Sequence, residues 1–361
     1  MLRTIRNLIV NIMAACIRDR DARHKFRNKY KIRSKFRKLR DDNQKILKEL
    51  RRLAAENRKT QTRITDLERY VYIDRIRPLT YKDSLYKYSP PSTYISMACI
   101  AKNEGPYIKE WIEYHKIVGV ERFYFYDNES TDQTKDVLKP YIEDGTVIYK
   151  YVTGRLMQMK AYKDAVYHSR GDTVWLALID LDEYLVPVEQ DNLHDVLIDY
   201  EKYPGLVVKW VSFDCNGHEK KPTAHGGLIT ANYTRVPLDY NCVYNRHFKS
   251  IVRPDFVIDI RGAHHSIYRG NRHAVNENCV EIQTGKEIDP AGSVNKIRIN
   301  HYFSKSKEEY LQKMKRGYMV PHPDKQYKID NPKVDFTIET AQDMVIQKYL
   351  PRLKTALGIK D

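Results

Sequence analysis

The sequence predicts an α/β domain with a largely parallel sheet, preceded by a basic amphipathic helix and a coiled coil. Three observations carry this prediction. From about residue 94 onward, apolar runs alternate with helical patterns. A seven-residue apolar repeat covers about 39–72, and positive charge is concentrated in residues 1–40. The length of 361 residues and the hydrophobic share of 42% allow a substantial core.

The first segment, residues 1–40, is predicted to lie on a membrane surface. It holds 14 Lys or Arg residues against two Asp, a net charge of +12 within the +16 of the whole chain. One helical face of 2–17 is apolar, but the run 8–17 is far shorter than the roughly 20 residues that span a bilayer. The alternatives are nucleic-acid binding and a solvated basic helix. The apolar face favours anionic lipid.

Residues 41–75 are predicted to form a coiled coil. Two seam positions alternate at spacings of four and three. One seam position is occupied by Leu39, Ile46, Leu53, Thr60 and Leu67, and the other by Asn43, Leu50, Asn57, Ile64 and Val71. Asn at such positions fixes register and favours dimers, which predicts a parallel homodimer. The alternative is one helix packing on the chain's own folded domain. Residues 76–93 contain Pro90-Pro91 and are predicted to be a linker.

Residues 94–361 are predicted to form the folded domain. Strands are expected at 94–101, 120–126, 146–151 and 173–180, and helices at 104–117, 131–141 and 156–169. This alternation implies right-handed crossovers between parallel strands. Five scattered cysteines without C-x-x-C spacing argue against a disulfide framework or a zinc cluster and favour a reducing compartment.

The stretch TVWLALIDLDEYL (173–185) combines a buried strand with an acidic end. Asp180 and Asp182 follow the apolar run, with Glu183 beside them. Open α/β sheets bind ligands at the carboxyl ends of their strands. Two carboxylates there can hold a hard divalent cation that keeps open positions for phosphate oxygens and stabilises departing charge. The alternative is that these aspartates cap a strand–turn junction.

The first two predicted strands also end in polar loops. Asn103 and Glu104 follow the first strand and precede a helix, where backbone N–H groups and the helix dipole can meet phosphate. Asp127 ends the second strand, where a carboxylate can accept hydrogen bonds from a base or a ribose. Helix capping is the alternative role for this cluster.

Taken in chain order, these segments resemble GT-A glycosyltransferases. The motifs are K-N-E, W-I-E-Y-H-K-x-x-G-V, F-Y-x-Y-D-N-E-S-T-D and D-L-D-E-Y-L. More narrowly, residues 94–320 resemble glycosyltransferase family 92 and its bacterial family 2-like relatives. The resemblance implies a GT-A-type, Rossmann-like mixed sheet flanked by helices. It also implies a nucleotide diphosphate sugar as donor, Mn²⁺ or Mg²⁺ as cofactor, and transfer to a hydroxyl of an acceptor glycan.

The resemblance also implies roles for individual residues. Asp127 corresponds to the acid that contacts the nucleoside, and Asp180 and Asp182 to the D-x-D pair. Asp180, Asp182 and His301 are the expected metal ligands, with Asp182 favoured over Asp180 for direct contact. His301 corresponds to a carboxyl-terminal His that returns to the metal or diphosphate, and imidazole suits manganese. Basic groups that could neutralise the leaving diphosphate are Lys305, Lys313 and Arg316.

Inversion at an anomeric carbon needs a base near the acceptor hydroxyl. The loop in 210–222 offers Asp214, His218 and Glu219, of which one is expected to act. Family 92 relatives tend to have Gly where Asp214 stands. His264 and His265 could bind acceptor, orient the metal shell, or be buried histidines.

The sequence therefore predicts a dimeric, metal-dependent hexosyltransferase acting on a polysaccharide or lipid-linked glycan. We expect it in the cytoplasm, peripherally associated with the inner leaflet of the plasma membrane, because the tail lacks an export signal. One alternative is a nucleotidyltransferase, against which the loop K-N-E-G-P-Y argues because it lacks the expected Gly- and Arg-rich composition. The other is a non-catalytic coiled-coil or nucleic-acid-binding scaffold, although nucleic acid is a disfavoured partner.

Overall fold

The computed structural model describes residues 91–262, 264–283, 292–316 and 334–359, with short pieces between residues 11 and 56. The chain divides into two units, residues 1–87 and 88–361. In the first unit, residues 20–29 are helical, and the Asp19 carboxylate caps them by accepting a hydrogen bond from Asp21 N at 2.9 Å. Most of the predicted amphipathic helix, coiled coil and linker lies outside the described residues.

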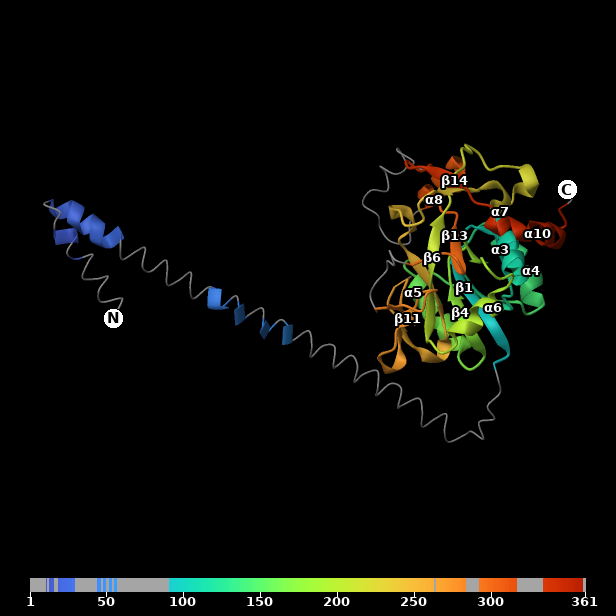
Figure 1. The fold of residues 1–361 in the computed structure, drawn as a ribbon, viewed down its shortest axis with the longest axis horizontal. Helices are drawn as coiled ribbons and strands as arrows, with labels where there is room; N and C mark the ends of the chain where they lie inside the picture. The colour runs from blue at the N-terminus through green and yellow to red at the C-terminus, as the bar shows by residue number, and fades with distance from the viewer. Residues whose placement is uncertain are drawn as a thin grey trace, which may run out of the picture. The chain divides into compact units, whose positions relative to one another are not determined.

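The second unit is built on a mixed sheet (Figure 1). Its path runs β12-β11-β6-β8-β4-β1-β2-β3, and β13 joins β5 to β6 off this path. The parallel core consists of β1 (Thr93–Ala101), β2 (Arg122–Asp127), β3 (Val147–Tyr151) and β4 (Thr173–Leu178). The antiparallel neighbours and the strands beside them are β5 (Glu183–Pro187), β6 (Gly205–Ser212), β8 (Phe248–Val252) and β13 (Ile297–His301). The mixed α/β architecture is thus confirmed.

Helices cover both faces of this sheet. On one face lie α3 (Gly105–Ile117), α4 (Thr134–Glu143) and α10 (Leu350–Leu357), and on the other lies α5 (Gln158–Ser169). All seven elements predicted between 94 and 180 are present, with ends within three residues of those expected. The remaining elements are α6 (Leu193–Leu197), α7 (Ile229–Asn232), β7 (Arg235–Pro237), β9 (Val257–Ile260), β10 (Ser266–Tyr268), β11 (Ala274–Val275), β12 (Glu281–Ile282), α8 (Lys307–Arg316) and β14 (Thr340–Gln342), beside short 3₁₀ turns.

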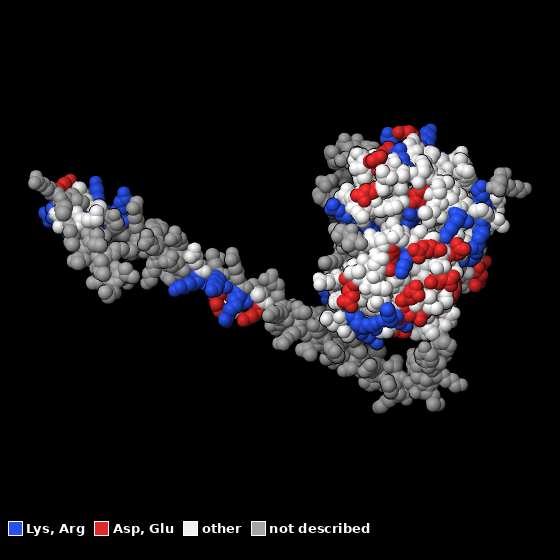
Figure 2. Space-filling model, in the orientation of Figure 1, with Lys and Arg blue, Asp and Glu red and all other residues white. Residues whose placement is uncertain are grey.

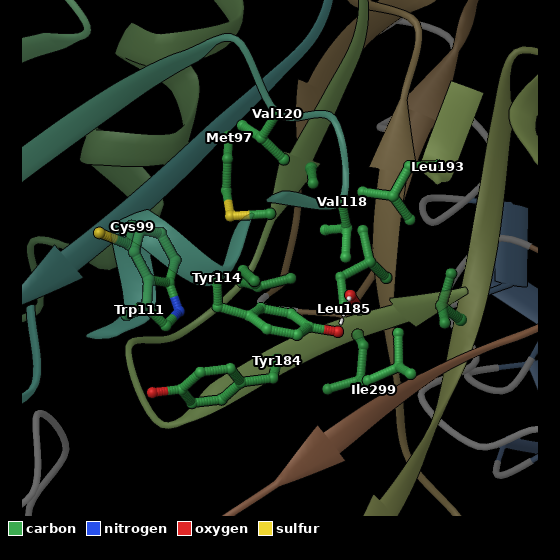
Figure 3. Close-up of a cluster of buried hydrophobic side chains, with 14 of the residues drawn as sticks. Met97, Cys99, Trp111, Tyr114, Val118, Val120, Tyr184, Leu185, Leu193 and Ile299 are labelled. Atoms are coloured by element: carbon green, nitrogen blue, oxygen red, sulfur yellow. Dashed lines mark hydrogen bonds between the residues drawn. The ribbon is translucent and has the colours of Figure 1, made fainter. Parts of the chain in front are cut away.

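The larger core cluster fixes the strand that follows the acidic turn. From α3, Trp111 Nε1 donates to the carbonyl oxygen of Glu183 at 2.8 Å, and the Tyr114 hydroxyl donates to that of Leu185 at 3.2 Å. Both aromatic side chains are fully buried and pack beside Tyr184 (Figure 3). Because β5 begins directly after Asp182, the packing of α3 on β5 also positions the D-x-D turn.

His115 is a buried histidine with both ring nitrogens used. Its Nε2 accepts from Leu185 N at 3.1 Å, so its Nδ1 carries the proton and donates to the carbonyl oxygen of Trp111 at 2.8 Å. Burial lowers the pKa of His115 to about 3. The folded protein therefore keeps this imidazole neutral where an unfolded chain would protonate it.

We expect His115 to make the folded state lose stability as the pH falls. Below about pH 6.5 the unfolded chain binds a proton that the folded protein refuses, so this group removes about 1.4 kcal/mol between pH 7.5 and 5.5. Urea unfolding at both pH values measures it. In His115→Asn the loss between the two pH values should shrink by that amount, whereas His168→Asn, at an exposed histidine, should retain it. Equal losses in wild type and His115→Asn would contradict the assignment.

Candidate active site

The carboxyl ends of three parallel strands bring the predicted residues to one edge of the sheet. Ala101 at the end of β1 is paired with Asp127 at the end of β2, and β4 runs parallel to β1 on its other side. His301 ends β13, where it is paired with Glu183 at the start of β5. The backbone N–H of Tyr302 donates to the carbonyl oxygen of Asp182 at 2.8 Å. The backbone at Asp182 and Glu183 is therefore held by the end of β13 and by Tyr302, which follows it.

The carboxylate of Asp180 is fully engaged by other side chains. Its Oδ1 accepts from Gln158 Nε2 at 2.7 Å and from the Tyr162 hydroxyl at 3.0 Å. Its Oδ2 accepts from Lys249 Nζ at 2.8 Å. Lys249 is 1% exposed and its Nζ also lies 3.8 Å from Glu183 Oε2. Burial alone would lower the pKa of Lys249, but the two carboxylates outweigh it and raise the pKa.

Asp182 has different neighbours. Its Oδ2 accepts from Lys313 Nζ of α8 at 2.5 Å, and its Oδ1 lies 3.9 Å from His301 Nε2. Burial would raise the pKa of Asp182, but Lys313, His301 and Lys305 outweigh it and hold the pKa below the usual range. Burial lowers the pKa of His301 to about 4. At neutral pH the carboxylate is therefore ionised and the imidazole is neutral.

Asp182 and His301 fit a divalent cation, whereas Asp180, whose side chain is 34% exposed, is shared with Gln158, Tyr162 and Lys249. A metal ligand must be an ionised carboxylate or a neutral imidazole, and both conditions are met. Asp182 Oδ1 and His301 Nε2 lie 3.9 Å apart, so the two side chains would hold a divalent cation between them and would supply one oxygen and one nitrogen ligand. Among the described residues, no group of three or more His, Cys, Asp or Glu side chains is placed to hold an ion. Water and phosphate oxygens would complete the shell.

Lys305 connects the loop after β1 with the D-x-D turn. Its Nζ lies 3.8 Å from Glu104 Oε2 and 4.3 Å from the centre of the Tyr107 ring. Its side chain is 5% exposed, and its charge is one of those that lower the pKa of Asp182. The sequence-predicted Glu104 and Lys305 thus lie together, and Lys305 is close enough to Asp182 to act on its charge.

Asn103 and Asp127 hold the two neighbouring loops together. Asn103 Oδ1 accepts from Thr131 N at 2.7 Å, and its own N–H donates to Ser130 Oγ at 2.9 Å. Asp127 is buried and accepts from Ser130 N at 2.9 Å and from the Tyr149 hydroxyl at 2.8 Å. Each of these side chains therefore has a structural role in the turn, whatever it also binds.

Two of the three predicted base candidates are paired with cations. Asp214 is buried and accepts from Arg235 Nε at 2.9 Å and Nη2 at 2.8 Å. It also accepts from the backbone N–H of Phe336 at 3.1 Å. The side chain of Glu219 is 74% exposed, and its Oε2 lies 3.2 Å from Lys307 Nζ. Arg235 thus engages both carboxylate oxygens of Asp214.

His218 is the candidate without an ion pair among the described contacts. Its Nε2 lies 3.3 Å from the carbonyl oxygen of Asn232. A carbonyl only accepts, so Nε2 donates this hydrogen bond, and in the neutral ring Nδ1 is the nitrogen with the lone pair. Its ring packs edge-on against Tyr233, whose hydroxyl donates to Glu309 of α8 at 2.7 Å.

A cluster of aromatic rings lies beside the acidic turn, of which the sequence had singled out His264 and His301 but not Trp210 and His247. Trp210 near the end of β6 lies 4.2 Å, ring centre to ring centre, from His301, 5.4 Å from His247 and 5.5 Å from His264. Lys249 was missed as well. A lysine within the apolar strand F-K-S-I-V (248–252) signals a buried partner of opposite charge and could have been noticed.

The matched family model places the protein among the glycosyltransferases, and the mixed α/β sheet with acids at its strand ends agrees with that class. The chain belongs to glycosyltransferase family 92, whose sequence model matches residues 94–349. A family 92 protein of Oryza sativa subsp. japonica is 31% identical over 158 residues, which is 43% of this chain and 26% of the relative. One from Ricinus communis is 30% identical over 181 residues, 48% of this chain and 32% of the relative. The matches thus span about a third or less of these relatives.

Solved structures with related folds are distant. S. aureus TarS in complex with UDP-GlcNAc has 19% identity and a TM-score of 0.31, over 45% of this chain and 46% of TarS. Glucosyl-3-phosphoglycerate synthase of M. tuberculosis, in complex with Mn²⁺, UDP-glucose and phosphoglyceric acid, has 18% identity and a TM-score of 0.23, over 33% and 44%. At these scores the likeness carries no inference about the function of this chain.

Proposed function

We propose that this protein transfers a hexose from a nucleotide diphosphate sugar to a hydroxyl of a polysaccharide or lipid-linked glycan, with inversion. The supporting observation is the meeting of Asp182, His301 and Lys305 at the carboxyl edge of the sheet, in a chain of family 92. This combination presents an ionised carboxylate, a neutral imidazole and an ammonium to one place. The carboxylate and the imidazole can hold a divalent cation, and the cation and the ammonium can neutralise a pyrophosphate.

Each side chain has a task in this reaction. Asp182 and His301 would hold Mn²⁺ or Mg²⁺, which when bound supplies positive charge to the departing diphosphate. Lys305 neutralises phosphate from the other side, beside Glu104. Asp127 and Asn103 shape the loops that receive the nucleoside. Asp180 acts by position: it anchors the start of the turn through Lys249, Gln158 and Tyr162.

His218 is the proposed base. Its Nδ1 takes the proton of the acceptor hydroxyl while the oxygen forms the new bond to the anomeric carbon and the diphosphate leaves from the opposite face. Asp214 and Glu219 are not assigned this step, because Arg235 and Lys307 hold their carboxylates.

A donor panel tests the activity itself. We expect the full chain with Mn²⁺ to hydrolyse or transfer from one member of a set of UDP- and GDP-hexoses, measured by release of the nucleoside diphosphate. His218→Gln should lower transfer by about 10²–10⁴-fold, the range for loss of a general base. The matched control is His225→Gln, at an exposed histidine that lies outside the proposed site. Absence of release from every donor would contradict the proposal.

The amino-terminal segment supplies the proposed membrane and dimer contacts. None of the described helices is long and apolar enough to cross a membrane. The face of the second unit seen in Figure 2 mixes acidic and basic side chains. In the sequence, residues 1–40 carry +12 of the net charge of +16. Ile46 and Leu53, two seam residues of the predicted coiled coil, are 56% and 49% exposed in the single chain. The basic charge supports contact of residues 1–40 with the anionic inner leaflet, and the exposed seam residues support a homodimer.

Deleting residues 1–40 is expected to release the protein from anionic liposomes while turnover of soluble substrates is unchanged. Each basic residue near such a surface contributes about 1 kcal/mol, and a net charge of +12 would be lost. Co-sedimentation with anionic vesicles measures this, with neutral vesicles as the control. Equal sedimentation of both forms with anionic vesicles would rule out the membrane contact.

A further inference from the structure

The two aspartates of the D-x-D turn are paired with lysines that differ in how firmly they are held. Lys249, the partner of Asp180, is 1% exposed and lies within β8. It is also near a second carboxylate, that of Glu183. Lys313, the partner of Asp182, is 22% exposed and belongs to the last turns of α8. The first lysine has no room to leave its carboxylate. The Lys313 side chain is flexible and partly exposed to solvent.

The Asp182 carboxylate is largely shielded from water, and the Lys313 ammonium stabilises its charge in place of solvent. The Asp182 side chain is 13% exposed, and a buried carboxylate needs a compensating charge. Lys313 supplies that charge at 2.5 Å. Its ammonium also donates to the carbonyl oxygen of Phe303 at 3.1 Å and lies 3.9 Å from the centre of the Phe303 ring. These contacts form a binding site for one ammonium group beside Asp182.

A divalent cation and the Lys313 ammonium cannot both interact fully with the Asp182 carboxylate. A cation bridging Asp182 Oδ1 and His301 Nε2 would lie on the same carboxylate as Lys313, and like charges that close repel strongly in a poorly hydrated site. Lys305 adds a second ammonium nearby. Binding of the ion therefore drives the more mobile cation, Lys313, toward another anion.

We propose that Lys313 is a tethered competitor for the metal: it occupies Asp182 before the ion binds and then moves to the diphosphate of the donor. This inference rests on the proposed function, since it takes Asp182 as a metal ligand. It makes ion and donor binding cooperative, because the ammonium that the ion displaces gains a phosphate partner only when the donor is present. Ion binding without donor is correspondingly weakened.

The test measures Mn²⁺ binding to the full chain, by the electron paramagnetic resonance signal of free Mn²⁺, without and with UDP. We expect Lys313→Met to bind Mn²⁺ alone about tenfold more tightly than wild type, or about 1.4 kcal/mol. With saturating Mn²⁺, the same variant should bind UDP about tenfold more weakly. Lys313→Arg keeps the charge and should resemble wild type. Lys307→Met, on the same helix but paired with the exposed Glu219, should leave both affinities unchanged.

The outcomes separate this inference from the function on which it rests. Equal Mn²⁺ affinity in wild type and Lys313→Met, with binding lost in Asp182→Asn, would overturn the competition and leave the metal role of Asp182 standing. Mn²⁺ binding that Asp182→Asn does not change would overturn both. Circular dichroism of each variant shows that it is folded, and a folded Lys313→Met that binds Mn²⁺ less tightly also overturns the inference.

Discussion

Replacing Asp182 by Asn is expected to reduce glycosyl transfer about a thousandfold or more. The substitution keeps the size and one oxygen of the side chain but removes the charge that would hold the cation beside His301. A bound metal contributes several kcal/mol to stabilising a departing oxyanion, which corresponds to a rate effect of this order. Initial rates with the donor identified by the panel, at saturating Mn²⁺, measure the loss.

Glu219→Gln is the matched control for this substitution. It makes the same change from carboxylate to amide at a side chain that is 74% exposed, and transfer should stay within about twofold, as expected for a rim charge. If Asp182→Asn kept a tenth or more of the wild-type rate, Asp182 would not be the metal ligand.

Replacing Lys249 by Met is expected to lower the free energy of unfolding by about 3–5 kcal/mol, the cost of leaving buried charge unpaired. Asp180 would lose its only cationic partner among the described contacts, and Glu183, which is fully buried, would lose its nearby ammonium. Burial already raises the pKa of the Glu183 carboxyl well above its usual range. Urea denaturation at pH 7 measures the loss.

A second substitution should recover part of this stability. Lys249→Met combined with Asp180→Asn removes the unpaired charge, so the double variant should be more stable than Lys249→Met alone. Lys163→Met is the control, since its salt bridge with Asp259 is half exposed and contributes about 1 kcal/mol or less. A loss below about 1 kcal/mol in Lys249→Met would show that this cluster does not hold the turn.

The elements around the site were predictable because their signals are local. The apolar strand ending at Asp180, the helix around Trp111 and the strand ending at Asp127 carry their period and their end signals within a few residues. Parallel strands then bring their carboxyl ends together without further information. His301 was placed by family resemblance, and β13 does deliver it beside Asp182.

The partners of the two aspartates could not be predicted in the same way. Lys249 and Asp180 are 69 residues apart in sequence, and Lys313 and Asp182 are 131 apart. Their meeting depends on the antiparallel return of β8 beside β4 and on the position of α8 after β13. The pairing of Asp214 with Arg235 likewise depends on the packing of β7. Asp214, a base candidate in the sequence, therefore forms a salt bridge that links two parts of the fold.

The central claim is that Asp182 binds a nucleotide diphosphate through a cation. Isothermal titration of UDP and GDP into the full chain, with and without Mn²⁺, tests it most directly. We expect one nucleotide to bind wild type only when Mn²⁺ is present, and we expect Asp182→Asn to lose that binding. Binding of the same strength in Asp182→Asn, or binding that ignores Mn²⁺, would contradict the claim.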